Sequence, residues 1–587
     1  MTRKIFTFAF FLIATTVTVI MYWFLYDQPL IGIDDSNIYF VYAKNLIEGH
    51  GLVYNPGGEN VEGFTSMFWL LIISGFYAIS ENYEMMLMAF TGLLIAFTLY
   101  KTASLLDLMN DARRIISPTS FFLPGALFLV PGYIDWTVIT LMETGLWSVL
   151  IILFTTTISF AVLMDNLHGF RFVYAILSAL MIVTRPESLL WAPVFIVFLV
   201  VMALLKEYNI RSAIKLVLPG IILSAVTLIG LTIFRLQYFG YPLPNTYYAK
   251  VSSDTLYNIF QGVRYFIRAC IKLPFLFVVS CGVGYSGLTL LRKALASYRQ
   301  SGRLVFSTNE RVQLLLTGVS LISLLIPVVT GGDHFHMARF YQPYFPIYLA
   351  TALNITFWQT TAGLNLSIPD RTPTYVWMSL VLFFLYTTPK IPLHDYIDVK
   401  SPIAHEFRLA ELGRENGESL NTMFENVEKP GVGVSAAGGF AYGYTGETVD
   451  LMGLNNIAMA HAVADKKGIK NHAAFDIPTF FTLNPEIFHG YKKLSFFIVN
   501  DSLPPLLEDS GLKSFTFANN MYKGLLDDRK FVESYFPVII TYKDLKYTTY
   551  MRKDYIQYLQ KEGFEIEIRP SERRKHLMSE FYGAFNE

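Results

Sequence analysis

Two adjacent carboxylates, Asp34 and Asp35, follow the first apolar segment and head a polar stretch that ends in Val61-Glu62-Gly63-Phe64-Thr65. A carboxylate at the edge of a membrane segment can accept a proton from a substrate hydroxyl or orient a polar substrate. It can also do no more than cap a helix, since Asp followed by Ser and Asn favours a helix N-terminus or a turn. The residue types alone leave both readings open.

Further polar clusters stand at the ends of later apolar segments, and each has a structural explanation beside a chemical one. Glu143 and Glu187 could cap helices, and Arg185 and Arg339 could extend to the membrane surface or bind a phosphate with two hydrogen bonds. His334 could be structural, carry a proton or bind a metal. The clusters are Met142-Glu143-Thr144-Gly145, Thr184-Arg185-Pro186-Glu187, Pro244-Asn245-Thr246-Tyr247-Tyr248-Ala249-Lys250, and Gly331-Gly332-Asp333-His334 with Arg339.

Composition indicates a membrane protein that crosses the bilayer many times. Of 587 residues, 53% are hydrophobic and 16% charged, and the mean hydropathy is +0.40. This exceeds what the core of a soluble protein hides. The formal net charge is zero, which argues against a nucleic-acid partner. The two cysteines, Cys270 and Cys281, form no metal-binding or disulfide pattern.

The apolar runs predict about eleven transmembrane helices. The first, Ile5–Tyr26, follows Arg3 and Lys4 and reads as a retained signal anchor. Ser66–Ser80 is too short to cross easily and is expected to form an interfacial or re-entrant helix on the outer side. The other runs are Met85–Leu106, Pro118–Pro131, Leu146–Met164, Phe172–Val183, Leu189–Leu205, Leu216–Phe234, Ala269–Leu291, Leu314–Thr330, Tyr344–Phe357 and Tyr375–Thr388.

Charge sets the predicted orientation. The first loop, residues 27–65, carries six acidic residues against a single lysine, Lys44. Lys and Arg gather instead in the alternate segments, as expected of cytoplasmic loops. The N-terminus is therefore predicted to be cytoplasmic and the acidic loop to lie outside.

The amino-acid composition of the chain changes near residue 389. Residues 390–587 are richer in charge, Gly and Pro, and contain strand-like runs such as Phe496-Phe497-Ile498-Val499 and Val538-Ile539-Ile540-Thr541. We expect a transmembrane domain over residues 1–389, with outer loop 27–65 and interfacial helix 66–80, and a soluble α+β domain over 390–587. An odd number of spans places that domain outside the cytoplasm.

All the polar clusters then fall on the outer face, where they fit one type of reaction. Nucleotide sugars are made in the cytoplasm, so a transferase that works outside must take its sugar from a flipped lipid-phosphate carrier. Such a reaction needs a carboxylate for the acceptor proton, cations for the leaving phosphate and an apolar slot for the lipid. The acidic pair, the Arg, Lys and His residues, and the helices would supply these.

The same motifs resemble the GT-C glycosyltransferases, most closely the terminal arabinofuranosyltransferases of mycobacterial cell-wall synthesis. The first-loop segments Asp34–Leu46, Glu48–Gly57 and Val61–Thr65 are similar to that family's first outer loop. The similarity continues in the same order through Met142-Glu143-Thr144, Thr184-Arg185-Pro186-Glu187, Phe234–Gly240 with Leu243–Lys250, Gly331-Gly332-Asp333-His334 with Arg339-Phe340, and Val449–Leu454.

At three places the sequence differs from the family motifs, and these differences affect the prediction of the sugar more than that of the reaction class. Val41 stands where the family motif has an arginine, His336-Met337-Ala338 replaces a Pro-Gly-aromatic spacer, and Asn455-Asn456 stands where an acid is common. Another cation, such as Lys44, could replace the missing arginine. The resemblance therefore implies a glycosyltransferase, while arabinose or a related sugar remains open.

The resemblance implies a bacterial inner-membrane enzyme that moves a sugar from a polyprenyl-phosphate donor to a cell-envelope glycan or glycolipid. Asp34 is the first candidate for the catalytic carboxylate and Asp35 the second. Some enzymes of this architecture use a divalent cation, but no residue cluster here requires a metal or other cofactor. Expected phosphate or substrate contacts are Lys44, Arg185, Lys250, His334 and Arg339, and expected sugar or scaffold contacts are Glu62, Glu143, Asn245 and Asp333.

Two other classes of protein remain as alternatives. A flippase or transporter for lipid-linked sugars would carry charges in the middle of its spans and matching halves. A non-catalytic assembly factor would bind glycan through its outer domain and tolerate the loss of Asp34. The gathering of charge at one face favours the transferase.

Overall fold

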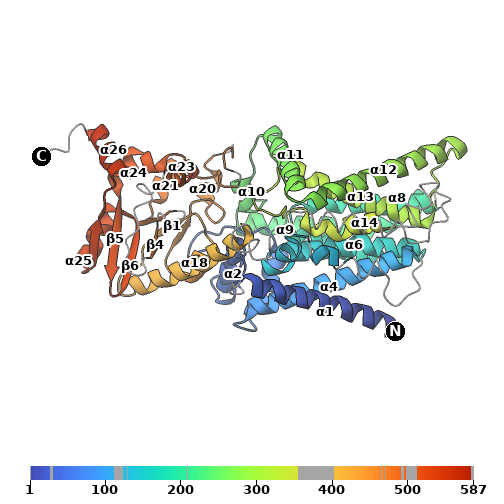
Figure 1. The fold of residues 1–587 in the computed structure, drawn as a ribbon, viewed down its shortest axis with the longest axis horizontal. Coiled ribbons are helices and arrows are strands. Elements are labelled where there is room, and N and C mark those ends of the chain that lie inside the picture. The colour runs from blue at the N-terminus through green and yellow to red at the C-terminus, as the bar shows by residue number, and fades with distance from the viewer. Residues whose placement is uncertain are drawn as a thin grey trace.

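The computed structural model describes most of the chain and shows a helical bundle joined end to end with an α+β region (Figure 1). The described residues are 2–26, 31–110, 123, 125–128, 130–207, 209–354, 402–463, 466–469, 471–490, 495–497 and 512–582. The predicted span Tyr375–Thr388 and the predicted boundary near residue 389 fall outside these residues, and the predicted span Pro118–Pro131 falls partly outside them.

Within these ranges, seven helices are long and apolar enough to cross a membrane. They are α1 (Thr2–Tyr26), α4 (Tyr83–Met109), α6 (Thr144–Leu163), α8 (Ser188–Glu207), α9 (Ile210–Tyr238), α12 (Pro274–Ser301) and α13 (Thr308–Val329). The predicted class, a polytopic helical protein with a C-terminal α+β region, is confirmed. The number of spans stays a prediction.

Shorter helices complete the bundle. The two apolar ones are α3 (Met67–Tyr77), where an interfacial helix was expected, and α7 (Arg171–Thr184). Ser66 caps α3 by accepting a hydrogen bond from the Trp69 amide. The others are α2 (Asp34–Ile47), α10 (Asn245–Lys250), α11 (Thr255–Lys272) and α14 (Phe345–Leu353).

Two predicted spans differ from the structure. The run Ala269–Leu291 is not one helix, because α11 ends at Lys272 and a new helix, α12, begins at Pro274. Pro274 suits the first turn of α12, where a backbone N–H is not needed and the fixed φ of proline matches the helix. The run Tyr344–Phe357 gives α14, which ends at Leu353.

The α+β region is built on a mixed seven-stranded sheet with the order β2-β1-β3-β6-β5-β7, in which β4 also pairs with β6. Strand β1 pairs in parallel with β2 and β3, and β5 and β6 form an antiparallel hairpin. The strands are β1 (Val432–Val434), β2 (Thr448–Asp450), β3 (Ile487–His489), β4 (Phe496–Phe497), β5 (Tyr535–Tyr542), β6 (Leu545–Arg552) and β7 (Glu565–Ile568). Strands β4 and β5 lie where the strand-like runs predicted them.

Helices surround this sheet, and the first of them, α18 (Pro402–Met423), runs from the bundle alongside the strands (Figure 1). The others are α19 (Gly439–Gly443), α20 (Ile457–His461), α21 (Ile477–Leu483), α23 (Leu512–Met521), α24 (Arg529–Ser534), α25 (Lys553–Lys561) and α26 (Glu572–Tyr582).

Helix α2 lies where the bundle meets the α+β region, and one hydrophobic core continues through both. Phe40 and Tyr42 of α2 belong to the same buried cluster as Ala437 and Phe440 beside β1. Arg414 of α18 strengthens the contact by donating hydrogen bonds to Asn37 (2.7 Å) and Glu84 (3.1 Å). The junction is therefore an interior rather than a loose linker.

Helix α11 packs against α13 through a glycine, which generates a testable prediction. A Cβ at Gly262 would lie 2.0 Å from the carbonyl oxygen of Val328, so Gly262→Ala must push the two helices apart. We expect a loss of roughly 1–3 kcal/mol of stability, measured as a lower Tm of the purified protein. Gly284→Ala in α12 is the control, because no atom lies within 4 Å of its Cβ position. Equal Tm values for the two variants would contradict this packing.

Candidate functional site

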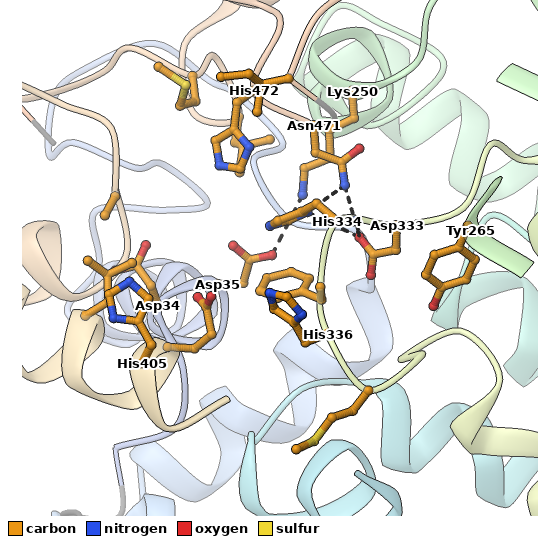
Figure 2. Close-up of a pocket in the computed structure, with 18 of the residues that line it drawn as sticks. Asp34, Asp35, Lys250, Tyr265, Asp333, His334, His336, His405, Asn471 and His472 are labelled. Carbon is orange, nitrogen blue, oxygen red and sulfur yellow. Dashed lines mark hydrogen bonds and ion pairs between the residues drawn. The ribbon is translucent and has the colours of Figure 1, made fainter. Parts of the chain in front are cut away.

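A cavity of about 550 Å³ opens at the junction between the bundle and the α+β region. Its wall comes from α2, α10, α11, the loop before α14, α18 and the loops that follow β1 and β2 (Figure 2). Five of the predicted site residues line it: Asp34, Asp35, Lys250, Asp333 and His334. Segments far apart in the sequence thus converge here, as the common outer-face position of the polar clusters led us to expect.

Asp34 is the first residue of α2 and is buried. Its Oδ1 accepts a hydrogen bond from the Gly439 amide at 2.8 Å, and its Oδ2 accepts one from the Gly438 amide at 3.1 Å. Burial raises the pKa of Asp34 to about 7, against the lowering effect of these two bonds. The carboxylate joins α2 to α19 and is only partly ionised near neutral pH, and it is not the exposed cap considered from the sequence.

Asp35 faces the cavity one residue further along α2. Its side chain keeps 22% of its surface exposed and lies 3.8 Å from Lys250 Nζ. Burial raises its pKa, but Lys250, Arg339 and His334 outweigh this and hold the pKa below its usual value. Asp35 is therefore an ionised carboxylate that a molecule in the cavity can reach.

The loop before α14 presents Asp333 and His334 to the cavity (Figure 2). Asp333 is buried, 2.6 Å from Arg339 Nε, and accepts a hydrogen bond from Asn471 Nδ2 at 3.0 Å. Burial alone would raise the pKa of Asp333, but Arg339 and His334 hold it well below its usual range. Asn471 also lies 2.8 Å from His334 Nδ1, which fixes the imidazole at the rim.

The backbone of this loop is strained. Met337 and Ala338 both have positive φ, 57° and 53°, a conformation that costs of order 1 kcal/mol or more for residues with a Cβ. Gln342 supports the turn by donating hydrogen bonds from Nε2 to the Met337 and Pro131 carbonyls. This turn directs Arg339 back onto Asp333, and the guanidinium stacks 4.4 Å from the centre of the Phe335 ring.

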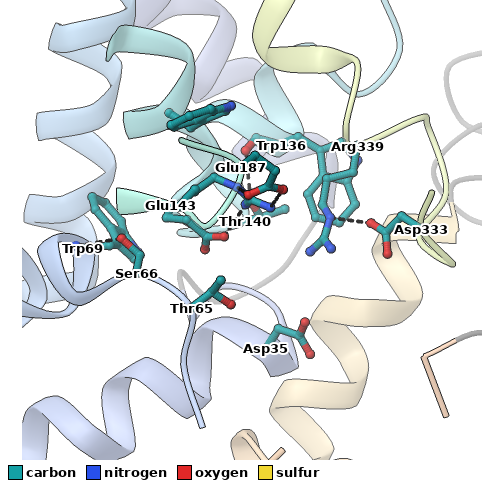
Figure 3. Close-up of polar contacts among 12 residues, drawn as sticks. Asp35, Thr65, Ser66, Trp69, Trp136, Thr140, Glu143, Glu187, Asp333 and Arg339 are labelled. Carbon is teal, nitrogen blue, oxygen red and sulfur yellow. Dashed lines mark hydrogen bonds and ion pairs between the residues drawn. The ribbon is translucent and has the colours of Figure 1, made fainter. Parts of the chain in front are cut away.

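A second polar network contains Glu143 and Glu187 (Figure 3), and both of these carboxylates bind Arg185. The guanidinium binds both oxygens of Glu187, at 3.1 and 2.8 Å, and also Glu143. Tyr39 of α2 donates to Glu143 at 3.2 Å and accepts from the Ser66 amide at 3.0 Å. Arg185 and Glu143 do not line the cavity. The guanidinium of Arg185 already binds two carboxylates, those of Glu143 and Glu187.

The remaining predicted residues also lie outside the cavity wall. Glu62 forms a buried ion pair with Arg235, 2.8 Å from Nε. Asn245 donates to the Gly453 and Leu454 carbonyls at 2.8 and 3.0 Å, which ties α10 to the loop after β2. Lys44 sits 5.7 Å above the Tyr442 ring, away from the cavity.

Several cavity residues were not among the candidates from the sequence. Glu406 of α18 lines the wall near Asp35, and no motif marked it. Arg264, Arg268 and Lys272 line it from α11. Their spacing of four residues, on a helix whose other positions are largely apolar, was a signal that the sequence did contain.

Among the described residues, no group of three or more His, Cys, Asp or Glu side chains is placed to hold a metal ion.

No protein-family model matches this chain. A terminal β-(1→2)-arabinofuranosyltransferase of Corynebacterium glutamicum is 25% identical over 412 residues, which are 63% of this chain and 55% of that protein. The chain therefore spans about half the length of this curated relative. The match confirms the resemblance that the motifs predicted. A crystal structure of the Archaeoglobus fulgidus oligosaccharyltransferase aligns with a TM-score of 0.39 and 11% identity, over 74% of this chain and 62% of that one.

The two neighbouring aspartates should respond differently to substitution. Asp34→Leu leaves the amides of Gly438 and Gly439 without an acceptor, and we expect a loss of roughly 2 kcal/mol or more, measured as a lower Tm. Asp35→Leu removes only a partly exposed ion pair and should cost less than about 1 kcal/mol. A lower Tm for Asp35→Leu than for Asp34→Leu would contradict the conclusion that Asp34 holds α2 against α19.

Proposed function

We propose that the chain is a membrane glycosyltransferase that moves a sugar from a polyprenyl-phosphate donor to a glycan or glycolipid of the cell envelope. The observation that carries this proposal is the ionised, partly exposed carboxylate of Asp35 in a cavity that also has a cationic wall. A sugar transferred from a lipid phosphate needs a proton acceptor on one side and positive charge on the other. The ordered motifs and the arabinofuranosyltransferase relative support the same class.

In this reaction the acceptor hydroxyl oxygen attacks the anomeric carbon, and the bond from that carbon to the phosphate oxygen breaks. The bonding electrons leave with the polyprenyl phosphate, and the hydroxyl proton passes to a base. We assign the base to Asp35, because its lowered pKa keeps the carboxylate deprotonated and able to accept a proton, and because the residue lines the cavity. Asp34, the first candidate from the sequence, would position α2, since both its oxygens are occupied by amides.

The buried ion pairs would act as a scaffold. Glu143, Arg185 and Glu187 hold α2 against the helices behind it, and Asp333 with Arg339 shapes the loop that carries His334. Lys250 and His334 remain at the wall as contacts for the substrate. Arg185, which the motif suggested as a phosphate ligand, would therefore act indirectly.

We propose a bacterial inner-membrane location, with a cytoplasmic N-terminus and residues 390–587 as an extracytoplasmic domain. The support is the acidic first loop and the Lys and Arg of the opposite segments. The α+β region adjoins the end of the bundle at which α2 lies (Figure 1), and α2 carries Asp35. Both would therefore face the outside together.

The sugar would be arabinofuranose or a related one. Asn455, which belongs to the Asn455-Asn456 pair where an acid is common in the family, donates from Nδ2 to Asp450 at 2.9 Å and accepts from Tyr42 at 3.2 Å. Asp450 and Leu454 line the cavity. An acid at position 455 would repel the Asp450 carboxylate. This chain therefore differs from the family pattern at the edge of the cavity, where the protein would contact the sugar.

The reaction is tested with the purified full chain and a panel of polyprenyl-phosphate pentoses and hexoses, with release of polyprenyl phosphate as the measurement. Asp35→Asn should lower the rate roughly 10²–10⁴-fold, as the loss of a general base does. Glu81→Gln, at an exposed acid beyond the cavity wall, should keep the parent rate. Release by Asp35→Asn at the parent rate would refute the role of Asp35. No release from any donor by the parent would favour a transporter or assembly factor.

Glu406 makes the reaction sensitive to pH. Burial and the nearby Asp35 and Asp34 carboxylates raise the pKa of Glu406 to about 8. Below that pH Glu406 is neutral, and above it a new negative charge forms beside Asp35 and repels the donor phosphate. We expect the KM for the donor to rise as the pH increases through about 8. Glu406→Gln should remove this rise, and an unchanged pH profile in that variant would contradict it. The charged groups that shift the pKa of Glu406 are Asp35, Asp34 and Asp333, which raise it, and Arg339, which lowers it.

A further inference from the structure

Helix α11 has three distinct faces. One is buried against the bundle through Asn258, Gly262, Tyr265 and Ala269. A second consists of apolar side chains that remain exposed, from Leu256 (79%) and Phe260 (59%) to Ile267 (51%) and Ile271 (72%). The third lines the cavity with Gln261, Arg264, Arg268 and Lys272. Residues spaced by three or four lie on one side of a helix, so the three faces run as parallel stripes.

The exposed apolar stripe fits the interface of a bilayer. A helix with apolar side chains on one side and cations beside them lies in the membrane plane, with the apolar side among the upper acyl chains. Helix α12 begins immediately after α11, at Pro274, and is long and apolar enough to cross the bilayer. Helix α11 is thus attached to a span at the end where the cavity opens.

The cations of the third face differ from the others around the cavity. Lys250 lies near Asp35, and Arg339 is paired with Asp333. Within the part of the chain that the structure describes, Arg264, Arg268 and Lys272 form no ion pair with a carboxylate. Lys272 Nζ lies 3.4 Å from His336 Nδ1, and burial with nearby Lys272 lowers the pKa of His336, which keeps that ring neutral. The stripe therefore carries uncompensated positive charge.

We propose that Arg264, Arg268 and Lys272 bind the phosphate group of a lipid whose chain stays in the bilayer beside the apolar face of α11. Three cations at one wall match a phosphate, and Arg can bind it with two hydrogen bonds. The lipid chain need not enter the protein, since it lies against the neighbouring exposed stripe. This assignment rests on the proposed function, in which the lipid is the polyprenyl-phosphate donor and its sugar reaches towards Asp35 on another part of the same wall.

The test is binding of a radiolabelled polyprenyl phosphate to the full chain in phosphatidylcholine nanodiscs. The triple variant Arg264→Gln, Arg268→Gln and Lys272→Gln should bind it roughly tenfold or more weakly, while the weak binding of the uncharged polyprenol stays the same. Arg292→Gln, Arg299→Gln and Arg303→Gln together remove the same charge from outside the cavity wall and should bind as the parent does. Unchanged binding by the first variant, or an equal loss in the second, would overturn the proposal.

Competition separates the two sources of lipid phosphate. Unlabelled phosphatidic acid that competes as well as polyprenyl phosphate would support the phosphate site and assign it to phospholipids; weaker competition assigns it to the prenyl lipid. The assay also separates this inference from the proposed reaction. Loss of binding in the triple variant of a chain that transfers no sugar upholds the site and refutes the reaction. If the triple variant binds the donor as the parent does and the parent transfers sugar, the reaction is upheld and the phosphate site is refuted.

Spin labels test the orientation of α11. In a variant with Cys270→Ala and Cys281→Ala, a label on Ile267→Cys should be more accessible to oxygen than to a water-soluble nickel complex. A label on Leu412→Cys is the control, because Leu412 is an exposed leucine of α18 in the α+β region and should show the opposite preference. Preference for the nickel complex at position 267 would overturn the membrane placement.

Discussion

The hydrogen bonds between the Asp34 carboxylate and two consecutive glycine amides are the contact on which the site depends. They fix the start of α2, a bundle helix, to the start of α19 in the α+β region. The approach is close: a Cβ at Gly438 would lie 1.8 Å from the Asp34 carbonyl oxygen. A larger residue there would separate the two regions. Because Asp34 is held in this way, the next residue, Asp35, is turned by about 100° around the helix and faces the cavity.

Several buried charges among the described residues form ion pairs, whereas some of the charges that line the cavity keep exposed surface. Burying an ion costs several kcal/mol unless a partner and further hydrogen bonds compensate. Glu62 with Arg235, and Arg185 with Glu143 and Glu187, meet that requirement away from the cavity. At the cavity, Asp35 and the cations of α11 keep exposed surface. A negative and a positive wall then face the same space, as transfer from a lipid phosphate requires.

The sequence located much of this site but could not assign its parts. The predicted topology grouped Asp34, Asp35, Lys250, Asp333 and His334, because it places all of them at the outer face of the membrane. It could not say which aspartate is buried, since that depends on Gly438 and Gly439, some 400 residues away in the chain. For the same reason the pairing of Arg185 was invisible. The length of an apolar run does not reveal helix α11, because its apolar residues recur with a 3.6-residue period and its last turn adjoins the span that begins at Pro274. Glu406 comes from a helix that no motif marks.

A structure of the full chain with a non-cleavable polyprenyl-phosphonate sugar bound would test the central claim most directly. We expect the phosphonate to lie against Arg264, Arg268 and Lys272 and the anomeric carbon to point towards the Asp35 carboxylate. Asp34 should keep its bonds to Gly438 and Gly439. A phosphonate bound at Arg185, or a sugar that contacts Asp34 while Asp35 faces away, would contradict it.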